Sequence, residues 1–350
     1  MKAEYKKSLA LLVVVVFTAM ALVGCGASTS KEQPKSGEAI KMPISHTSSL
    51  ESPWQKGAVQ MAAMINKESN GKFNVEVFGN GVLNQKNWKI MFEQTQAGSN
   101  TIAIESVTAL GSIVNELSAL NLPFMFDDVA HMSRFIDSNP PVLQKWLKKF
   151  EEKNLVVLAV APRPFRQLIN SKLLIKTPKD IEGLKFRVPQ NPLFVKVFEA
   201  MGAKPVPMSS GEIYSAIQLG TVVGEDNSVP VVYDFKTHEV AKFMTIWNYM
   251  GDASLVVMNK TQWDKLTDTE KALFKKAAKL WTDINIKEDT EYSVIARQNM
   301  EKAGVKFYDM NADEKKAFAD RMGPVYADFE KVTGAEDFKA FREALAKTRK

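Results

Sequence analysis

The sequence predicts an α/β fold arranged as two lobes. Apolar runs of strand length alternate with amphipathic stretches of helical length through the first two thirds of the chain, a pattern typical of parallel sheets covered by helices. This alternation begins near residue 40 and starts again after residue 163. The helical pattern over residues 267–303 is almost unbroken. At ~1.5 Å per residue this helix would span roughly 55 Å, more than the width of one lobe, so we expect it to cross both.

The first unit has the order β-α-β-α-β and continues to a further strand. Asn70 and Gly71 end its first helix, and Gly98 ends its second, as expected for residues that tolerate a left-handed backbone. Its strands are predicted at residues 40–45, 73–78, 101–105 and 155–160. Its helices are predicted at residues 53–69 and 87–96, with two more after Pro123 that are interrupted at residues 139–141.

The second unit repeats the pattern and leads into the long helix, where Leu273, Ala277 and Leu280 form part of an apolar stripe at helical spacing. The remaining elements are strands at residues 165–170 and 185–188, with helices at residues 192–201, 211–219, 312–332 and 335–347. We assign residues 40–163 and 253–290 to lobe I, and residues 164–252 and 291–350 to lobe II.

The N-terminus resembles a bacterial lipoprotein signal. Three lysines precede an apolar run at residues 9–23, which is shorter than the roughly 20 residues that span a membrane. Small residues then lead to Cys25, the only cysteine. Two acyl chains on Cys25 would hold the protein durably at a membrane, whereas the alternative is an ordinary signal with an incidental cysteine. We expect residues 1–24 to be removed and the polar residues 25–39 to be a flexible tether.

Composition and motifs argue against catalysis, metal binding and nucleic-acid binding. The net charge of +6 falls to about +4 without the signal, which carries three lysines and one glutamate; it forms no basic block, although it favours an anionic ligand. One cysteine excludes internal disulfides and the usual four-ligand zinc sites. The three histidines lie in unrelated segments, and no nucleophile or phosphate-binding motif is present. We expect no enzyme activity, no cofactor and no metal.

Two arginines are candidates for binding an anion, because the guanidinium is a planar fork of donors that matches a carboxylate. Arg166 and Arg187 both lie in predicted strands. Strand alternation places Arg187 on the face opposite Phe186 and Val188, and Pro189 ends the strand. For each arginine the alternative is a surface side chain paired with a carboxylate.

The segments around these arginines resemble the DctP-type substrate-binding proteins of TRAP (tripartite ATP-independent periplasmic) transporters. The resemblance rests on residues 177–189, 201–208, 212–220 and 224–227, and it extends to residues 71–78 and 122–126. It implies a class II-like two-lobe periplasmic binding protein fold with central sheets flanked by helices. Such a protein closes on a small organic carboxylate and delivers it to the membrane subunits of the transporter.

The resemblance also implies roles for single residues. Arg187 pairs with the ligand carboxylate, Asn227 lies beside it, and Arg166 adds a second cationic contact. Glu105 resembles a ligand-contacting acid of some members and could accept hydrogen bonds from a hydroxyl or an ammonium; the alternative is a solvated carboxylate at a strand end. The other candidates for substrate binding are Gln190, where some members have a shorter amide, Ser210, where many have an aromatic residue, Asn87 and His46. Asp226 replaces the more usual glutamate beside Asn227.

The expected partners are a small organic acid, the TRAP membrane subunits and the lipid bilayer, reached through acylated Cys25. The expected location is extracytoplasmic, and the expected state is a monomer. The main alternative is a receptor of an ABC transporter or a sensory ligand-binding protein with the same two-lobe plan. An enzyme that uses Glu105 and Asp226 as paired carboxylates is a more distant alternative.

Overall fold

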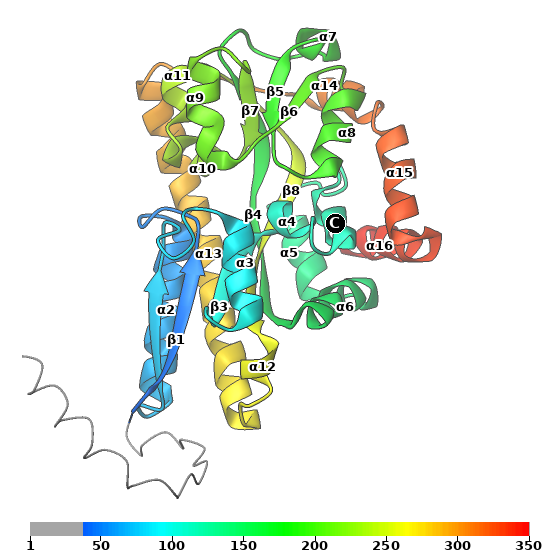
Figure 1. The fold of residues 1–350 in the computed structure, drawn as a ribbon. Coiled ribbons are helices and arrows are strands. Elements are labelled where there is room, and N and C mark those ends of the chain that lie inside the picture. Colours follow the sequence, from blue (N-terminus) through cyan, green and yellow to red (C-terminus); the bar gives the residue numbers. More distant parts are fainter. Residues whose placement is uncertain (1–37, 350) are drawn as a thin grey trace, which may run out of the picture. The chain divides into compact units, whose positions relative to one another are not determined.

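The computed structural model describes residues 38–349, and one mixed nine-stranded sheet runs through it (Figure 1). The strand order is β2-β1-β3-β8-β4-β7-β5-β6, with β9 paired to β8. The two central strands, β4 (Leu155–Asn170) and β8 (Phe243–Asn259), pair antiparallel along most of their length. The other strands are β1 (Ile40–His46), β2 (Phe73–Phe78), β3 (Ile102–Ser106), β5 (Lys185–Val188), β6 (Lys204–Pro207), β7 (Gly224–Asn227) and β9 (Lys306–Asp309).

The central strands divide the sheet into a first flank of β2, β1 and β3 and a second flank of β7, β5 and β6. Parallel pairing, as predicted, is found inside each flank. In contrast, β4 and β8 run antiparallel to the flanking strands β7 and β3. Residues from Ala39 onward form one compact unit, and the boundaries of the two lobes stay a prediction.

Helices cover both faces of the sheet. Their first turns carry the capping residues that satisfy free backbone N–H groups, as at Ser52 before α2 and in the Thr267–Glu270 capping box of α13. The α-helices are α2 (Pro53–Glu68), α3 (Trp88–Ala97), α4 (Val107–Leu110), α5 (Val129–Asp137), α6 (Pro141–Lys148), α7 (Pro178–Ile181), α8 (Pro192–Ala200), α9 (Ile213–Gln218), α10 (Val229–Asp234), α11 (Thr237–Val240), α12 (Lys260–Trp263), α13 (Asp268–Lys302), α14 (Ala312–Ala319), α15 (Gly323–Thr333) and α16 (Ala335–Thr348). Short 3₁₀ helices are η1 (Asn115–Asn121), η2 (Lys149–Lys153) and η3 (Ser210–Glu212).

Helix α13 is the long helix that the sequence predicts, and it links two separate cores. Its first half buries Phe274 and Trp281 with α2 and the first flank. Its last turns bury Met300 in the core that contains Ile213 and Val232 from α9 and α10. Each fully buried ring contributes about 1.5–3 kcal/mol of hydrophobic stabilisation. Figure 1 shows α13 passing from beside α2 to beside α10, in agreement with its contacts.

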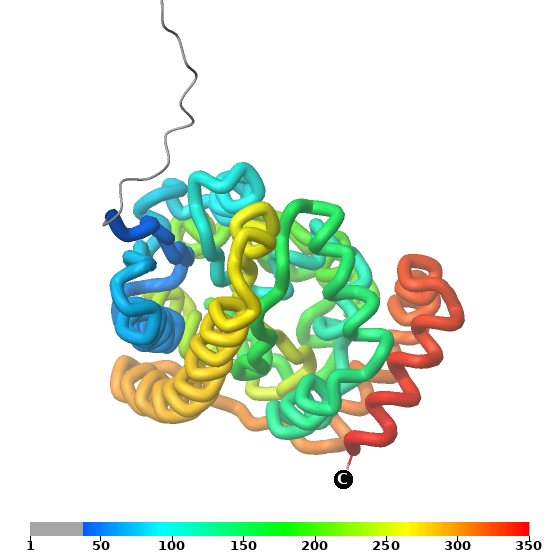
Figure 2. Tube along the Cα trace, turned by 90° about the horizontal axis from the view of Figure 1, so that it is seen from below, coloured from blue at the N-terminus to red at the C-terminus, as the bar shows by residue number. Residues whose placement is uncertain are grey.

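The C-terminal helices make a similar link on another side of the molecule. Helix α15 packs against α8 and η1, and α16 packs against α5 and α6. Figure 2 shows this pair, in red, apart from α13. The rings of Phe341 on α16 and Phe135 on α5 meet edge to face at 5.5 Å, a geometry that aromatic pairs prefer.

The structure corrects several predicted elements. Residues 155–160 and 165–170 belong to one strand, β4, whose pairing with β8 shifts register between Arg163 and Leu168. Bulges allow the strand to continue there although Pro162 and Pro164 lack an N–H group. The predicted helix at residues 312–332 is divided into α14 and α15, because Pro324 cannot continue a helix and starts a new one. No strand was predicted at residues 243–259, which form β8.

The signal peptide, Cys25 and most of the tether lie outside the described residues. Within residues 38–349, no helix combines the length and the apolar character needed to cross a bilayer.

Candidate ligand-binding site

Three predicted site residues lie on three neighbouring strands, the central strand β4 and the second-flank strands β7 and β5. Strand β7 sits between β4 and β5, so that Asn227 pairs with Gln167 of β4, and Glu225 pairs with Arg187 of β5. Arg166 precedes Gln167 on β4. Arg166, Arg187 and Asn227 are all buried, with 4%, 5% and 7% exposure. The alternative of a surface arginine is therefore wrong for both arginines.

The charge of Arg166 is almost fully balanced inside the protein. Its Nε donates to Asp226 Oδ2 at 2.5 Å, and its Nη2 donates to the Asp226 carbonyl at 2.7 Å. The hydroxyl of Tyr249 donates to the same Oδ2 at 2.8 Å, and the guanidinium lies 5.0 Å from the ring of Phe194. Burial alone would lower the pKa of Arg166, but the charge and hydrogen bond of Asp226 raise it above its usual value. Arg166 is thus held rigidly in place.

The charge of Arg187 is balanced much less well. Its Nε and Nη2 both donate to the Met208 carbonyl, at 3.1 and 3.0 Å, and its Nη1 lies 3.7 Å from Glu225 Oε2. Glu225 also accepts from Asn227 Nδ2 at 3.1 Å and from Thr237 Oγ1 at 2.8 Å. Burial lowers the pKa of Arg187 to about 10, and the attraction of Glu225 offsets this only in part. A buried cation with incomplete compensation is suited to receive an anion.

The two arginines approach β7 from different sides. Their partners, Glu225 and Asp226, are consecutive residues of β7, and consecutive strand residues point to opposite faces. Even so, Arg166 lies close enough for its charge to lower the pKa of Arg187 further. Both guanidiniums therefore belong to one electrostatic group.

Glu105 of β3 is buried, so it is not the solvated carboxylate of the alternative interpretation. Its Oε2 accepts from the Thr47 hydroxyl and its Oε1 from the Ser106 N–H, both at 2.8 Å. Burial raises the pKa of Glu105 to about 7, even though these hydrogen bonds and the charge of Arg163 act in the opposite direction. Glu105 can thus exchange a proton near neutral pH.

Sequence reasoning missed Arg163, which lies three residues before Arg166 on β4. Its Nη1 donates to Asp252 Oδ2 at 2.9 Å, and its guanidinium lies over the ring of Trp54 at 4.8 Å. The available signal was a second arginine in the segment that precedes residues 165–170. Because prolines stand on both sides of Arg163, and proline cannot donate to a strand ladder, no strand was predicted there.

The remaining candidates are not joined to the arginines by any hydrogen bond or ion pair within residues 38–349. Asn87 is exposed and caps α3, accepting from the Lys89 N–H at 2.9 Å. Gln190 and Ser210 are exposed. His46 is buried with Nε2 2.8 Å from Gln55 Oε1, and burial lowers its pKa to about 4, so the ring is neutral at pH 7.

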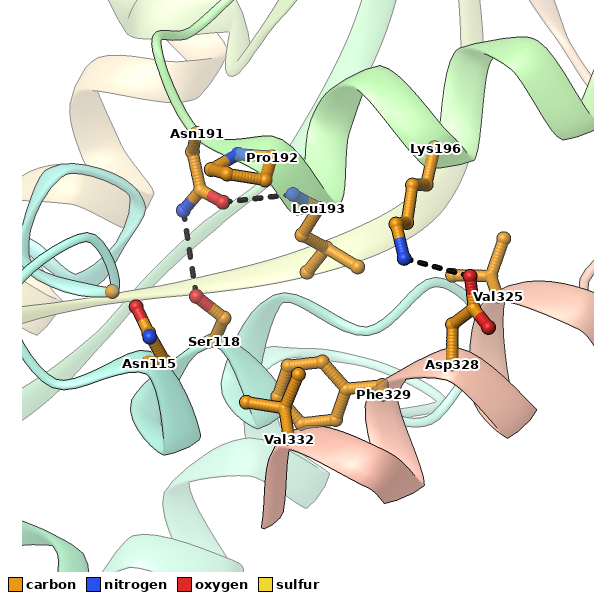
Figure 3. A pocket seen from close by; sticks show the side chains of 11 residues that line it. Asn115, Ser118, Asn191, Pro192, Leu193, Lys196, Val325, Asp328, Phe329 and Val332 are labelled. Carbon is orange, nitrogen blue, oxygen red and sulfur yellow. Dashed lines mark hydrogen bonds and ion pairs between the residues drawn. The ribbon is translucent and has the colours of Figure 1, made fainter.

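A cavity of about 140 Å³ lies elsewhere, where α8, η1 and α15 meet (Figure 3). Several of its polar groups are already engaged, since Asn191 Oδ1 accepts from the Leu193 N–H and Lys196 pairs with Asp328 at 2.7 Å. None of the predicted site residues lines it. Its lining is largely apolar, which does not suit a carboxylate. In the part of the chain that the structure describes, no group of three His, Cys, Asp or Glu side chains is placed to hold a metal ion.

Comparison with known proteins identifies the class. Residues 44–332 match the family model described as bacterial extracellular solute-binding protein, family 7 (DctP). The C4-dicarboxylate-binding periplasmic protein DctP of Rhodobacter capsulatus is 29% identical over 331 residues, covering 93% of this chain and 97% of that protein.

Two solved structures share the fold. A TRAP periplasmic solute-binding protein from Chromohalobacter salexigens with bound D-glucuronate has 26% identity and a TM-score of 0.82, and the match covers 88% of this chain and 100% of that chain. A TRAP periplasmic solute-binding protein from a Bradyrhizobium species, in complex with α/β-D-galacturonate, has 31% identity and a TM-score of 0.79, with coverage of 87% and 99%.

These findings define a solute-binding protein with the α/β fold of the periplasmic receptors. The chain belongs to family 7 of the bacterial extracellular solute-binding proteins, the DctP-type receptors of TRAP transporters. The expected family and fold class are confirmed, and the TRAP interpretation is favoured over an ABC-type or sensory protein. The family consists of solute receptors, not enzymes.

Proposed function

We propose that this receptor binds a small organic carboxylate through Arg187, between the two predicted lobes, and delivers it to its TRAP membrane subunits. The observation that carries the proposal is the incomplete compensation of Arg187, whose nearest carboxylate oxygen lies 3.7 Å away. A carboxylate buried without a partner costs several kcal/mol, and a guanidinium can offset that cost. An arriving anion also relieves the unfavourable burial of Arg187, so both partners gain.

Arg166 and Asn227 have supporting roles in this proposal. Arg166 is locked by Asp226, so in this proposal it presents its guanidinium to the ligand from a fixed position. Asn227 donates to Glu225 and so keeps that carboxylate turned partly away from Arg187. The ligands of the relatives, D-glucuronate, D-galacturonate and C4-dicarboxylates, are all carboxylates and support this class of ligand.

The proposal includes closure of the predicted lobes, residues 40–163 with 253–290 and residues 164–252 with 291–350. Ligand binding favours the closed state as a population shift, because the anion binds better where both sides contact it. We also propose cleavage after residue 24 and diacylation of Cys25, with the polar residues 25–39 as the tether of a monomer. The sequence pattern of charged, apolar and small residues before Cys25 supports this part.

Calorimetric titration of Arg187→Ala and Arg187→Lys with D-glucuronate, D-galacturonate and succinate tests the central claim. We expect each variant to bind at least tenfold more weakly than the wild type every acid that the wild type binds. Arg297→Ala is the matched control, because Arg297 lies on the surface of α13 and pairs with Glu301 and Asp309. Unchanged affinity in a folded Arg187→Lys variant contradicts the proposal.

A further inference from the structure

Glu225 is a buried acid whose counter-charge is the same arginine that the proposed function assigns to the ligand. It lies on β7 and is 0% exposed. Its register partner on β5 is Arg187, and Arg187 Nη1 lies 3.7 Å from Glu225 Oε2. The two side chains therefore meet on one face of the sheet, and a ligand held by Arg187 would compete with Glu225 for the guanidinium.

One side of Glu225 is apolar. Its register partner on β4 is Ile169, which belongs to a core that also contains Ile213 of α9 and Val232 of α10. Among the residues that the structure describes, Arg187 makes the only ion pair with Glu225. Burial raises the pKa of Glu225, and the charge of Arg187 opposes this shift. The ionised form of Glu225 thus depends on the charge of Arg187.

The other charged and titratable groups near Glu225 do not replace this arginine. Asp226, the next residue on β7, adds a like charge. On α11, Thr237 contacts Glu225 and is neutral, while Lys236 before it is exposed. His238 follows Thr237, and burial lowers its pKa, so its ring is neutral at pH 7. None of these groups holds Glu225 in its charged form once the arginine is engaged by another anion.

Arg187 Nη1 is the guanidinium nitrogen that Glu225 and a ligand would share. The Nε and Nη2 groups already donate to the Met208 carbonyl, at 3.1 and 3.0 Å. Nη1 lies 3.7 Å from Glu225 Oε2. Because an N–H···O bond is about 2.9 Å long, a ligand oxygen on Nη1 would lie at most roughly 6.6 Å from that oxygen. A second negative charge at this distance disfavours the ionised form of a buried carboxyl.

The two hydrogen-bond partners of Glu225 suit both of its protonation states. Thr237 Oγ1 donates to Glu225 Oε1 at 2.8 Å, and Asn227 Nδ2 donates to Oε2 at 3.1 Å. A hydroxyl and an amide each carry a donor and an acceptor, so Asn227 can turn its amide over and accept from a protonated carboxyl. The protonated form therefore leaves no buried donor unpaired, which would otherwise be costly.

From this arrangement we infer that binding of an organic carboxylate to Arg187 drives the uptake of a proton by Glu225, so that the receptor binds its ligand more tightly as the pH falls. The proton comes from solvent and forms an O–H bond on the Glu225 carboxylate, while the ligand stays ionised and pairs with Arg187. This inference rests on the proposed function, in which Arg187 holds the ligand carboxylate.

The sign of the pH dependence follows from reciprocity. If the ligand raises the affinity of Glu225 for a proton, the proton raises the affinity for the ligand by the same factor. The complex keeps the proton to higher pH than the free protein does. The gain in affinity is therefore present at low pH and is lost as the pH rises through the pKa of Glu225 in the complex.

Titration calorimetry of the wild-type mature chain with D-glucuronate, D-galacturonate and fumarate tests the inference, because these acids are ionised at both pH 6 and pH 8. Titrations in HEPES and in Tris at pH 7.4 measure proton uptake, since the two buffers release protons with different enthalpies. We expect uptake of at least about 0.3 proton per bound acid, and binding at least about threefold tighter at pH 6 than at pH 8.

Glu225→Gln should abolish the uptake and flatten the pH dependence, because the neutral amide imitates the protonated carboxyl. Glu239→Gln is the matched control. Glu239 lies on α11, is exposed and accepts from the Tyr214 hydroxyl at 3.2 Å, so this variant should keep both effects. If Glu225→Gln does not fold, Thr237→Val provides a second test. It removes a donor to the ionised carboxylate and should move the pH profile of affinity to higher pH.

The inference is overturned if the wild type binds an acid without proton uptake, if none of the three acids binds, or if folded Glu225→Gln keeps the uptake. Uptake by another acid, such as Glu105, would survive in Glu225→Gln. An unchanged profile in Thr237→Val also contradicts the inference. Failure of the proposed function is a separate result, because Arg187→Lys then retains its affinity for every acid. Failure of the inference alone leaves Arg187→Lys weak and the wild-type pH profile flat.

Discussion

Arg187 Nη1 lies 3.7 Å from Glu225 Oε2, although the two residues are register partners on adjacent strands. Asn227 and Thr237 hold the Glu225 carboxylate through shorter hydrogen bonds of 3.1 and 2.8 Å. The protein thus keeps a counter-charge near Arg187 but directs its best hydrogen bonds elsewhere. Glu225 therefore stabilises the unliganded protein as a counter-charge, while Arg187 keeps part of its charge available to bind an anion.

Glu225→Gln should therefore have opposite effects on binding and on stability. Removing the carboxylate of Glu225 leaves the positive charge of Arg187 less compensated. We therefore expect carboxylate affinity to rise by about threefold, or ~0.7 kcal/mol. The unliganded protein should lose about 1–3 kcal/mol, because a buried cation loses its counter-charge. Titration calorimetry and urea unfolding of the same preparation measure both effects. Weaker binding together with unchanged stability would contradict this account.

Asp226→Asn tests the rigid placement of Arg166. The substitution leaves a buried guanidinium without its paired carboxylate, so we expect a loss of about 3 kcal/mol in the free energy of unfolding. The hydroxyl of Tyr249 would then donate to a neutral amide oxygen or to no acceptor, and no longer to a carboxylate. Chemical denaturation measures the loss, and Asp309→Asn, which breaks an exposed ion pair with Arg297, is the control that should change stability by less than about 1 kcal/mol. Equal effects of the two substitutions would show that Arg166 is not held as described.

Gly224→Ala tests whether close packing of β7 on β4 positions the site. A Cβ at Gly224 would lie 2.0 Å from the carbonyl oxygen of Ile169, which is backbone and cannot turn aside. We expect at least about 2 kcal/mol of destabilisation and weaker ligand binding, since β7 carries Asp226 and Asn227. Gly211→Ala is the control, because nothing lies within 4 Å of its added Cβ. Thermal unfolding and calorimetry of the two variants should differ clearly; similar values would contradict this packing argument.

Two acids with raised pKa values should make the unliganded protein less stable as the pH rises. The pKa of Glu105 is raised from 4.5 to about 7 and that of Asp289 from 3.8 to about 7, both mainly by burial. Because the folded state holds these protons longer than the unfolded state does, their contribution is complete below about pH 4 and is lost as the pH rises through 7.

His46 acts in the opposite direction, since burial lowers its pKa from 6.5 to about 4, but one imidazole does not outweigh two carboxyls. Urea unfolding between pH 5 and pH 8 measures the net change. Glu105→Gln and Asp289→Asn should each flatten the profile by up to ~1.4 kcal/mol per pH unit within this window. A wild-type profile that rises from pH 5 to pH 8, or variants with the wild-type slope, would contradict the assignment.

The sequence predicts the elements of this fold better than it predicts their pairing. Arg187 could be placed on a strand face because Phe186 and Val188 alternate with it and Pro189 follows. The partner Glu225 follows from the pairing of β5 with β7, between residues 38 positions apart in the sequence, which periodicity does not reveal. The strength of the contact, and so the difference between Arg166 and Arg187, depends on that pairing.

Arg163 shows a second limit of sequence reasoning. Prolines at positions 162 and 164 argue against a central strand, yet β4 continues through them by means of bulges. Asn87 and Ser210 stay predictions, because both are exposed and no contact with the arginines is present within residues 38–349, with Asn87 capping α3. Local capping satisfies that side chain as well as a ligand would, and the sequence does not distinguish the two.

The uninterrupted central strands bear on how such a receptor can move. Because β4 and β8 pass through the sheet without a loose connection between its flanks, a rotation of one flank against the other must be taken up as twist or bend within these two strands. Ladder hydrogen bonds are fewest where the register slips, between Arg163 and Leu168. The segment that bends most easily is therefore also the one that carries Arg163 and Arg166. A solute bound across this segment would restrict the bending of β4 and β8.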